Sequence, residues 1–369
     1  MAKSADVRGP VLVVGTGLLG ASIGLALREL GVEVGLQDIS PAALHLARDL
    51  GAGTPAGPDF HPALVVVATP PDVIVPAVVA ALRDHPDAVV TDVASVKGSL
   101  AGRVGEQVGA AVAQYVGSHP MAGRERSGPA AADSDLFQGR TWVICPHETS
   151  SDAAVGAVRA LAIAVGALPR VMEAAEHDAA VAAVSHLPQL VASLTAARLR
   201  ELPAEALALA GQGLRDVTRI AASDPMMWSP ILAVNSAAVL PHAEALLASL
   251  SDVVNALRTA AAEGMGAPGV MRVFAGAIEE GRQGAARIPG KHGGAARRYA
   301  EVMVFVPDKP GELGRLFAEI GQAGINIEDL RMEHAAGAKL GVATLSVLPA
   351  RAAPLMEHLE ELGWRVMVS

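Results

Sequence analysis

The sequence predicts an α/β unit with a parallel sheet, followed by an all-helical unit and then by a small unit of four strands and two helices. Three observations support this order. Short β-branched runs alternate with helical segments in residues 1–150, strand-like runs are missing from residues 151–286, and a β-α-β-β-α-β order occupies residues 298–369. A chain of 369 residues is also longer than a single hydrophobic core usually sustains.

The α/β unit contains a series of strand candidates, each followed by a helical segment or a turn. Strands that alternate with helices form parallel sheets with right-handed crossovers, so we expect one parallel sheet with helices on its faces. The candidates are Val11–Val14, Glu33–Gln37, Leu64–Ala68, Val89–Asp92, Tyr115–Gly117 and Thr141–Ile144.

The helical unit is rich in Ala and Leu, and its apolar residues recur every three or four positions, as in Val155, Val158 and Leu161. Several of its segments are apolar on more than one face, and such helices must be buried. We therefore expect a homodimer formed through this unit. Between Gly281 and Arg298 the chain is rich in Gly and Arg without an apolar period, so we place a linker at residues 287–297.

Composition narrows the class of partner. The net charge is −9 and no block of Lys or Arg is present, which argues against nucleic acid. No membrane span is expected, because the apolar stretch Ala63–Leu82 is interrupted by Pro and Asp and the stretch Ala153–Leu168 by Arg159. The N-terminus lacks the apolar core of a signal peptide. The single cysteine, Cys145, cannot form an internal disulfide, which fits a reducing compartment. We expect a cytoplasmic protein whose partners are small molecules or copies of itself.

A glycine-rich turn joins the first strand to the first helix. Gly15 permits the tight turn, Gly17 lets backbone N–H groups approach a pyrophosphate, and Gly20 lets the helix pack on the strand. A phosphate would lie at the positive end of that helix. The motif indicates a Rossmann-type NAD-binding domain, and its residues are Gly15, Thr16, Gly17, Leu18, Leu19 and Gly20.

Two further positions complete the expected cofactor site. Asp38 ends the second strand, where a carboxylate accepts hydrogen bonds from ribose hydroxyls and repels a 2′-phosphate, so NAD is favoured over NADP. Thr69 and Pro70 follow another strand at the carboxyl edge of the sheet, where they either contact a nicotinamide or only reverse the chain.

A dehydrogenase that oxidises an alcohol needs a base for the hydroxyl proton, and histidine is the side chain best suited to this near neutral pH. His119 stands apart from most of the other histidines because it follows a predicted strand, in a loop of glycine, proline and charged residues that covers no core. Ser95 also follows a strand, at the same edge of the sheet. These two residues are the candidates for the chemistry.

The helical unit holds two polar clusters inside apolar segments. His186 and Gln189 belong to the first cluster, SHLPQ. In the second, GLRDVTR, Arg215 and Arg219 are four residues apart, so they share a helical face and could grip an anionic ligand. The alternative is that they form surface ion pairs with Asp216.

Together these residues resemble the prephenate dehydrogenase family of tyrosine biosynthesis, with a C-terminal ACT domain. The resemblance covers nearly the whole chain, and several motifs in one order are more specific than any single motif. The motifs are DVASVKG (92–98), HPMAGRERSG (119–128), SHLP (185–188), GLRDVTR (213–219) followed by Ser223, Asp224, Pro225 and Trp228, and PDKPG (307–311) with Asn326 and Ile327.

The resemblance implies NAD-dependent oxidative decarboxylation of prephenate to 4-hydroxyphenylpyruvate. It gives His119 the role of accepting the proton of the ring hydroxyl, and Ser95 the role of supporting that histidine beside the cofactor. Arg219 would hold a substrate carboxylate, which suits a dianionic substrate. The residues that would line or gate the pocket are Glu125, Arg215, Asp216 and His186.

One departure from the family bears on the substrate. Many relatives carry a second histidine after SHLP, whereas this chain has Gln189, on the wall expected to meet the substrate side chain. Arogenate, which has an amino group in place of the keto group of prephenate, therefore stays open as the substrate, as does dual specificity.

Two other classes of protein share parts of this pattern. A β-hydroxyacid dehydrogenase typically uses a helical lysine as its acid and base, but no lysine occurs between Lys97 and Lys291. A non-catalytic NAD-sensing protein would explain the first and last units, yet it would not need His119 together with Ser95 and Arg219.

The small C-terminal unit is the expected regulatory part. ACT domains bind amino acids at the loops that the resemblance assigns here, and tyrosine is the implied feedback ligand, which would require coupling between two sites. The alternative is that this unit only helps the enzyme to dimerise. The loop residues are Asp308, Gly311, Asn326 and Ile327.

Overall fold

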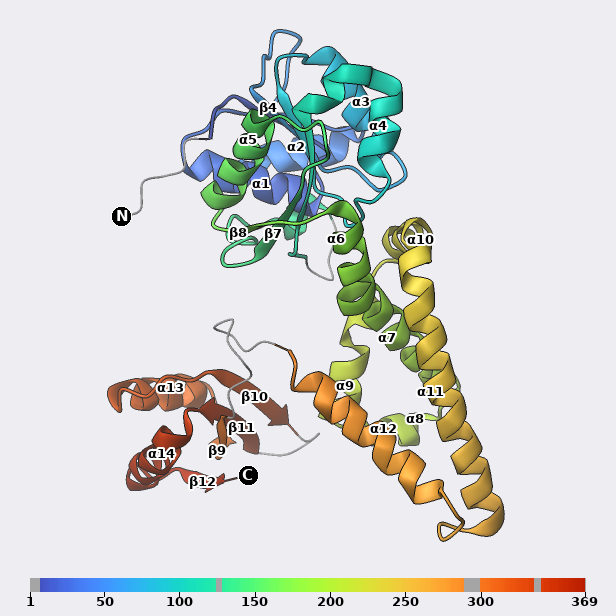
Figure 1. Ribbon diagram of the computed structural model, residues 1–369. Coiled ribbons are helices and arrows are strands. Elements are labelled where there is room, and N and C mark those ends of the chain that lie inside the picture. Colours follow the sequence, from blue (N-terminus) through green and yellow to red (C-terminus); the bar gives the residue numbers. More distant parts are fainter. Residues whose placement is uncertain (1–6, 124–127, 289–298, 335–339, 369) are drawn as a thin grey trace. The chain divides into compact units, whose positions relative to one another are not determined.

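The computed structural model describes residues 7–123, 128–288, 299–334 and 340–368. By its internal contacts the chain divides into two compact units, Met1–Leu247 and Ala248–Ser369. The first unit holds a sheet of eight strands and most of the helical segment, and the second holds a sheet of four strands (Figure 1).

The eight-stranded sheet contains all the strands predicted in the α/β unit. Its order is β3-β2-β1-β4-β5-β6-β7-β8, and the strands from β3 to β6 run parallel. The chain changes direction across the sheet at β1, which is the position where ligands bind in such folds. The strands are β1 (Val11–Val14), β2 (Val34–Gln37), β3 (Thr54–Pro55), β4 (Leu64–Val67), β5 (Val89–Asp92), β6 (Tyr115–Pro120), β7 (Thr141–Cys145) and β8 (Leu168–Val171).

Three features of this sheet differ from the sequence prediction. The two-residue strand β3 was not predicted, and both of its residues are exposed. Strand β7 pairs with β6 in the antiparallel direction, so the sheet is mixed rather than wholly parallel. Strand β8 pairs with β7, so the strand-free segment begins after Val171 and not at Ser151. Strand β8 has no alternating apolar pattern because it is short, contains Pro169 and is largely exposed at the edge of the sheet.

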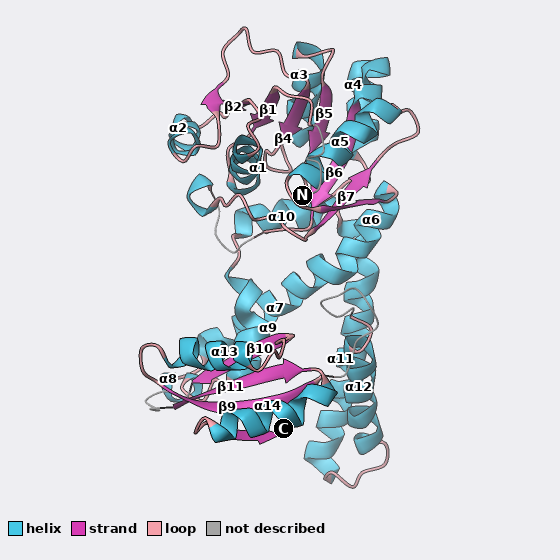
Figure 2. Cartoon of the chain, turned by 90° about the vertical axis from the view of Figure 1, so that its left-hand side faces the viewer, coloured by secondary structure: helices cyan, strands magenta, loops and turns pink. Residues whose placement is uncertain are grey.

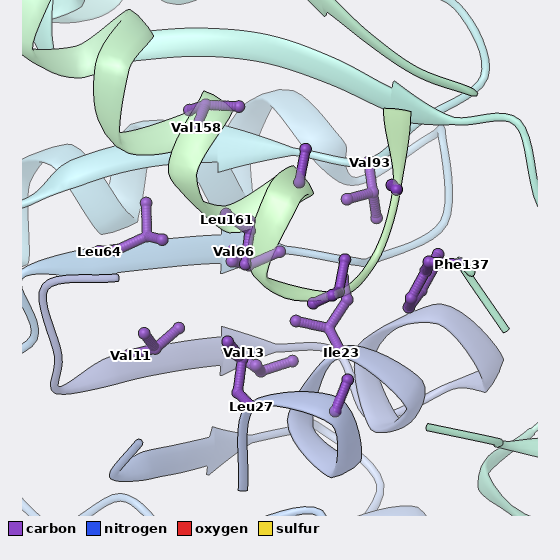
Figure 3. Packing of buried hydrophobic residues seen from close by; sticks show 14 of the residues in the cluster. Val11, Val13, Ile23, Leu27, Leu64, Val66, Val93, Phe137, Val158 and Leu161 are labelled. Carbon is purple, nitrogen blue, oxygen red and sulfur yellow. The ribbon is translucent and has the colours of Figure 1, made fainter. Parts of the chain in front are cut away.

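Helices cover both faces of the sheet, as the alternation of strands and helices predicts. Helices α1 and α5 pack against one face, in the cluster of buried residues that Figure 3 shows. Helices α3 and α4 pack against the other face. The helices of this part are α1 (Leu18–Glu29), α2 (Pro41–Asp49), α3 (Ile74–Asp84), α4 (Leu100–Val108) and α5 (Asp152–Ala164).

A helical segment follows β8 (Figure 2). Its first stretch is helical from Ala174 to Glu201, and within it Ala182–His186 forms a π-helical turn. Such a turn inserts one residue into an α-helix and often occurs at functional sites. The helices are α6 (Ala174–Val181), α7 (Leu187–Ala197), α8 (Ala204–Leu207), α9 (Gln212–Thr218), α10 (Pro225–Val234), α11 (Ser236–Glu263) and α12 (Val270–Ala285).

Two stretches of this segment are long and apolar enough, by length and composition alone, to span a membrane, and the sequence prediction of no membrane span did not consider them. They are Ala174–Glu201 and Ser236–Glu263, each with a mean hydropathy of 1.3. Only 28% and 6% of these windows are buried within the single chain. Leu240, Leu247 and Leu250 are among the exposed apolar side chains of α11. Apolar surface of this extent is what a helix shared with a second subunit presents.

The C-terminal sheet has the predicted β-α-β-β-α-β order of elements. Its strands are all antiparallel, in the order β10-β11-β9-β12, and a separate core of buried residues includes Val304, Leu316 and Leu355. The proposed linker at 287–297 lies outside the described residues except for its first two positions. The elements are β9 (Ala300–Pro307), α13 (Glu312–Gln322), β10 (Asp329–His334), β11 (Leu340–Val347), α14 (Pro349–Glu361) and β12 (Arg365–Val368).

Candidate active site

The glycine turn between β1 and α1 is packed at two of its glycines and open at the third. Gly15 has a φ of +95°, and a Cβ there would lie 2.6 Å from the carbonyl oxygen of Ala68. A Cβ at Gly20 would lie 1.9 Å from the carbonyl oxygen of Gly15. A Cβ at Gly17 would meet nothing within 4 Å. The turn therefore leaves free space next to Gly17, at the start of α1, where no side chain caps the helix.

Asp38 lies beside this turn. Its Oδ2 accepts hydrogen bonds from the backbone N–H of Thr16 at 2.6 Å and from the Thr16 hydroxyl at 2.8 Å, and its Oδ1 accepts one from the N–H of Ser40 at 2.8 Å. Thr69 follows β4, and its hydroxyl oxygen is buried without a hydrogen-bond partner among the described residues. The open space at Gly17, the uncapped helix and this hydroxyl fit a dinucleotide whose phosphates meet α1.

His119 lies in strand β6 and not in a loop after it. The strand continues to Pro120 because the antiparallel β7 pairs with its last residues, and His119 is opposite Val143. The sequence prediction ended this strand at Gly117 and did not include the antiparallel pairing with β7. Ser95 does lie in the loop after β5, and β5 and β6 are neighbours in the sheet.

The imidazole of His119 contacts a second histidine. Its Nδ1 lies 2.9 Å from Nε2 of His177, which is on α6, and the two rings meet edge to face. On the far side of His177, its Nδ1 lies 2.8 Å from Oδ1 of Asp178. His177 is buried, with 1% exposure, so its ring bridges the partly buried His119 and a carboxylate.

The environment shifts the pKa values of this cluster. Burial, followed by the charges of His177 and Lys97, holds the pKa of His119 well below its ordinary value of 6.5. Burial alone would raise the pKa of Asp178, but hydrogen bonds from His177 and from the N–H groups of Lys97 and Gly98 lower it below its ordinary value. His119 is therefore neutral and Asp178 ionised near neutral pH.

Asp178 also binds the loop that carries Ser95. Its Oδ1 accepts a hydrogen bond from the N–H of Lys97 at 2.8 Å, and its Oδ2 accepts one from the N–H of Gly98 at 2.7 Å. One carboxylate thus connects the loop after β5 to helix α6.

A buried polar cluster lies under the same loop. The Lys97 ammonium pairs with Oδ1 of Asp92, and both side chains are at most 1% exposed. The Tyr115 hydroxyl donates to Oδ2 of Asp92 at 2.6 Å. Burial and the Asp92 carboxylate raise the pKa of Tyr115 well above its ordinary value, and burial raises the pKa of Cys145 to about 12. Both groups therefore stay protonated, and neither is a nucleophile at neutral pH.

His186 lies at the end of the π-helical turn and is buried. Its Nδ1 lies 3.0 Å from Nδ2 of Asn235, which also donates to the backbone oxygen of Asp178 at 2.9 Å. Burial lowers the pKa of His186 despite the nearby Asp178 carboxylate. The Trp228 ring meets the His186 ring edge to face at 5.9 Å, and the Trp228 indole N–H is buried without a hydrogen-bond partner in the part of the chain that the structure describes.

Gln189, which the sequence analysis expects on the wall that meets the substrate side chain, is buried and hydrogen-bonded within the protein. Its Nε2 donates to the backbone oxygen of Ile220 at 3.0 Å and to Ser193 at 3.3 Å, and its Oε1 accepts from Ser223 at 3.4 Å. Its hydrogen bonds to Ile220 and Ser223 tie α7 to the turn that begins at Arg219.

The charged residues of the GLRDVTR segment lie on an exposed surface. Arg215 and Asp216 are on α9, and Arg219 begins the 3₁₀ turn that follows it. Asp216 accepts a hydrogen bond from Gln212 at 2.8 Å. Glu125 lies outside the described residues.

His177 and Asp178 are the site residues that the sequence did not reveal. They stand beside Glu176 at the start of an Ala-rich helix, a setting typical of solvent-exposed residues. The available signal was their spacing from the apolar Val181, because residues three or four apart share a helical face.

The sequence is similar to two family models and to several known proteins. The model of the prephenate dehydrogenase nucleotide-binding domain matches residues 23–170, and that of the prephenate dehydrogenase dimerization domain matches residues 173–268. The probable prephenate dehydrogenase NovF of Streptomyces niveus is 36% identical over 359 residues, which cover 96% of this chain and 98% of that protein. Prephenate dehydrogenase of Bacillus subtilis is 29% identical over 340 residues, which cover 89% of each chain.

A solved structure has the same fold over most of this chain. Prephenate dehydrogenase from A. aeolicus, in complex with hydroxyphenyl propionate and NAD+, has a TM-score of 0.64 and 28% sequence identity, and the match covers 76% of this chain and 100% of that one. The Rossmann-type sheet with its glycine turn, the helical segment after it and these matches lead to one conclusion: the chain belongs to the prephenate dehydrogenase family.

Proposed function

We propose that the protein is an NAD-dependent prephenate dehydrogenase, which oxidises and decarboxylates prephenate to 4-hydroxyphenylpyruvate. The observation that carries this proposal is the neutral His119, which is held by His177 in the last parallel strand of a sheet with a dinucleotide turn. A base of this kind is what the oxidation of a ring alcohol requires.

The cofactor site is built by the turn after β1. Gly15, Gly17 and Gly20 let the pyrophosphate approach α1, and Thr16 holds the Asp38 carboxylate beside the ribose position. Bound NAD supplies the acceptor for the hydride that leaves C4 of the substrate ring. The remaining cofactor contacts that we propose are Leu18, Leu19, Thr69, Pro70 and Ser95.

His119 manages the proton of the substrate hydroxyl. The neutral imidazole accepts this proton as the hydride leaves, so that the C–O bond becomes a carbonyl. Carbon dioxide then leaves from C1, the electrons of the broken C–C bond restore an aromatic ring, and the ring oxygen regains the proton as a phenol. No net proton is released, and aromatisation drives the reaction.

The carboxylates of the substrate need hydrogen-bond donors from the protein. Arg219 is our candidate for a substrate carboxylate, because a guanidinium matches a carboxylate with two parallel hydrogen bonds. The Trp228 indole N–H is buried without a partner among the described residues, and a ligand oxygen would satisfy it. Arg215, Asp216, His186 and Glu125 are proposed to line or gate the pocket.

One experiment tests the reaction and its closest alternatives. NADH absorbance is followed with the purified protein, NAD, and in turn prephenate, arogenate and a 3-hydroxy acid. Turnover of prephenate supports the proposal. Turnover of arogenate alone would make the protein an arogenate dehydrogenase, turnover of the 3-hydroxy acid alone would place it in a different class, and no turnover would favour an NAD-sensing protein.

Arogenate stays the second candidate substrate because of Gln189. The side chain occupies the position where many relatives have a histidine, and its amide is bonded to Ile220 and Ser223 instead of being available to the substrate. The preference of the enzyme for the keto side chain of prephenate or the amino side chain of arogenate then depends on residues other than Gln189. The ratio of kcat/KM for prephenate to kcat/KM for arogenate measures this preference.

We further propose that the working form is a homodimer in a soluble, cytoplasmic location. The matched dimerization domain contains the exposed apolar faces of Ala174–Glu201 and Ser236–Glu263. A second copy that covers these faces would remove them from water. Light scattering at micromolar concentration should give the mass of two chains.

We propose that residues 298–369 are an ACT domain with a ferredoxin-like fold, and that tyrosine binds at its loops. The support is the β-α-β-β-α-β order and the strand order β10-β11-β9-β12. Asp308, Gly311, Asn326 and Ile327 are the loop positions. Equilibrium binding of tyrosine to the full chain, compared with the Asn326→Ala variant, tests this. Binding that Asn326→Ala leaves unchanged would place any tyrosine site elsewhere, and no binding would leave dimerisation as the role of this unit.

A further inference from the structure

We propose that His177 and Asp178 are positioning residues for the catalytic base, and that the single Asp178 carboxylate positions both His119 and the Ser95 loop. The inference rests on the proposed function for its kinetic part. Its structural part rests only on the contacts that link Asp178, His177, His119 and the N–H groups of Lys97 and Gly98.

The first step concerns the tautomer of His177. Asp178 is ionised, and an ionised carboxylate can only accept hydrogen bonds. The 2.8 Å contact between His177 Nδ1 and Asp178 Oδ1 therefore requires that Nδ1 carry the proton and donate it. A neutral His177 then has its lone pair on Nε2.

The second step transfers this choice to His119. Its Nδ1 lies 2.9 Å from Nε2 of His177. With His177 neutral, as the proposal requires, this Nε2 is an acceptor, so the Nδ1 of His119 carries a proton and donates it. The lone pair of a neutral His119 is then on Nε2. This is the tautomer that lets Nε2 accept the proton of a substrate hydroxyl, and the opposite tautomer could not do so.

The third step concerns the loop after β5. Asp178 accepts the N–H groups of Lys97 and Gly98 with its two oxygens, and these residues follow Ser95 closely in the chain. The amide of Asn235 in turn holds the backbone oxygen of Asp178 at 2.9 Å. Movement of this carboxylate would disturb the base and the Ser95 loop together.

Two substitutions disturb Asp178 in different ways. Asp178→Asn offers one acceptor oxygen in place of two, so it cannot serve His177 and Lys97 on one side and Gly98 on the other. Gly98→Ala leaves every titratable group in place, but its Cβ would lie 2.7 Å from Oδ2 of Asp178 and would displace it. Glu176→Gln is the matched control, because Glu176 is an exposed carboxylate on the same helix.

The tautomer is measured directly on the full-length wild-type protein with ¹⁵N-labelled histidine, by the ¹⁵N shifts of the imidazoles and their long-range couplings. His119→Asn assigns the signal. The proposal expects the Nδ1–H tautomer for His119 near neutral pH. An Nε2–H tautomer there would overturn it, and this measurement stands whether or not any substrate is turned over.

Kinetics supply the second arm. Asp178→Asn and Gly98→Ala should each lower kcat by about 10²-fold while the KM for substrate stays within about threefold of that of Glu176→Gln, because positioning of the base acts on proton transfer and not on substrate binding. A kcat for Asp178→Asn equal to that of the control would overturn the proposal. If the wild type turns over no substrate, the proposed function fails, and the tautomer measurement alone decides this inference.

Discussion

The imidazoles of His119 and His177 meet edge to face, with Nδ1 of the first 2.9 Å from Nε2 of the second and their planes inclined by 78°. Two cations at this distance would repel each other strongly in a buried site. The pair therefore carries at most one extra proton, and the base that faces the chemistry is kept neutral. The pH behaviour of the enzyme and the effect of removing the base both follow from this contact.

Replacement of the base should abolish most of the activity while the fold survives. His119→Asn keeps a polar group of similar reach but cannot accept a proton, so kcat should fall by about 10²- to 10⁴-fold. The Kd for NAD, measured by quenching of protein fluorescence, should not change. Turnover close to that of the wild type would mean that another group takes the proton.

The acid side of the pH profile should lie lower than an ordinary histidine would place it. The base works only when neutral, so kcat/KM falls as the pH drops through the pKa of His119. Burial and the charges of His177 and Lys97 hold this pKa well below 6.5, so the half-maximal point should also lie below 6.5. An acid limb above 6.5 in the wild type would contradict the assignment of His119.

Two neighbouring glycines should respond differently to the same substitution. A Cβ at Gly20 would collide with the backbone of Gly15, so Gly20→Ala should lower the free energy of unfolding by ~3 kcal/mol. A Cβ at Gly17 meets only open space, so Gly17→Ala should keep the wild-type Tm. The same Cβ would occupy the place proposed for the pyrophosphate, and the Kd for NAD should rise about tenfold or more, or ~1.4 kcal/mol. Unchanged NAD binding in Gly17→Ala would remove the turn from the cofactor site.

The choice between NAD and NADP should depend on the charge of Asp38. Asp38→Asn keeps an oxygen that can accept the Thr16 hydrogen bonds but removes the negative charge that repels a 2′-phosphate. The ratio of kcat/KM for NAD over NADP should fall by about tenfold, ~1.4 kcal/mol. Glu33→Gln, an exposed carboxylate before β2, is the control. Equal discrimination in Asp38→Asn and the wild type would leave the preference to other residues.

Loss of the proposed carboxylate anchor should weaken substrate binding selectively. Arg219→Ala should raise the KM for prephenate by about 10- to 100-fold, because a hydrogen-bonded charge is lost. The Kd for NAD should stay the same, and Arg200→Ala, an exposed arginine outside GLRDVTR, should leave both constants unchanged. A KM that Arg219→Ala does not alter would assign the substrate carboxylate to another donor.

Secondary-structure elements with a local sequence pattern could be predicted from the sequence. Features that depend on which strands pair could not. The glycine turn and the strands β1, β2, β4 and β5 carry their own signals, namely glycine positions and buried apolar runs. Strand β7 was predicted, but its antiparallel direction was not, because strand direction depends on a partner distant in sequence. Strand β6 was therefore predicted too short, and His119 was placed in a loop.

The sequence analysis missed two residues of the site, His177 and Asp178, for the same reason: their contacts are with residues distant in the sequence. His177 and Asp178 act through atoms of residues about 58 to 81 positions away in the chain, and no short window of sequence records such contacts. Gln189 is the opposite case, because the sequence analysis named it as a site residue but could not predict its contacts. Its hydrogen bonds to Ile220 and Ser223 form only where α7 packs against the turn at Arg219.

The π-helical turn Ala182–His186 determines where this helix can lose a residue without changing the directions of its side chains. It contributes one residue more than a regular α-helix would have between His177 on α6 and Gln189 on α7. Each residue turns a helix by about 100°. Deletion of a single alanine here would replace the π-helical turn with regular α-helix, so the directions of His177 and Gln189 about the helix axis would stay nearly the same. A one-residue deletion is therefore compatible with helical phase at this turn, whereas the same deletion elsewhere in α6 or α7 would rotate the two ends of the helix relative to each other by about 100°.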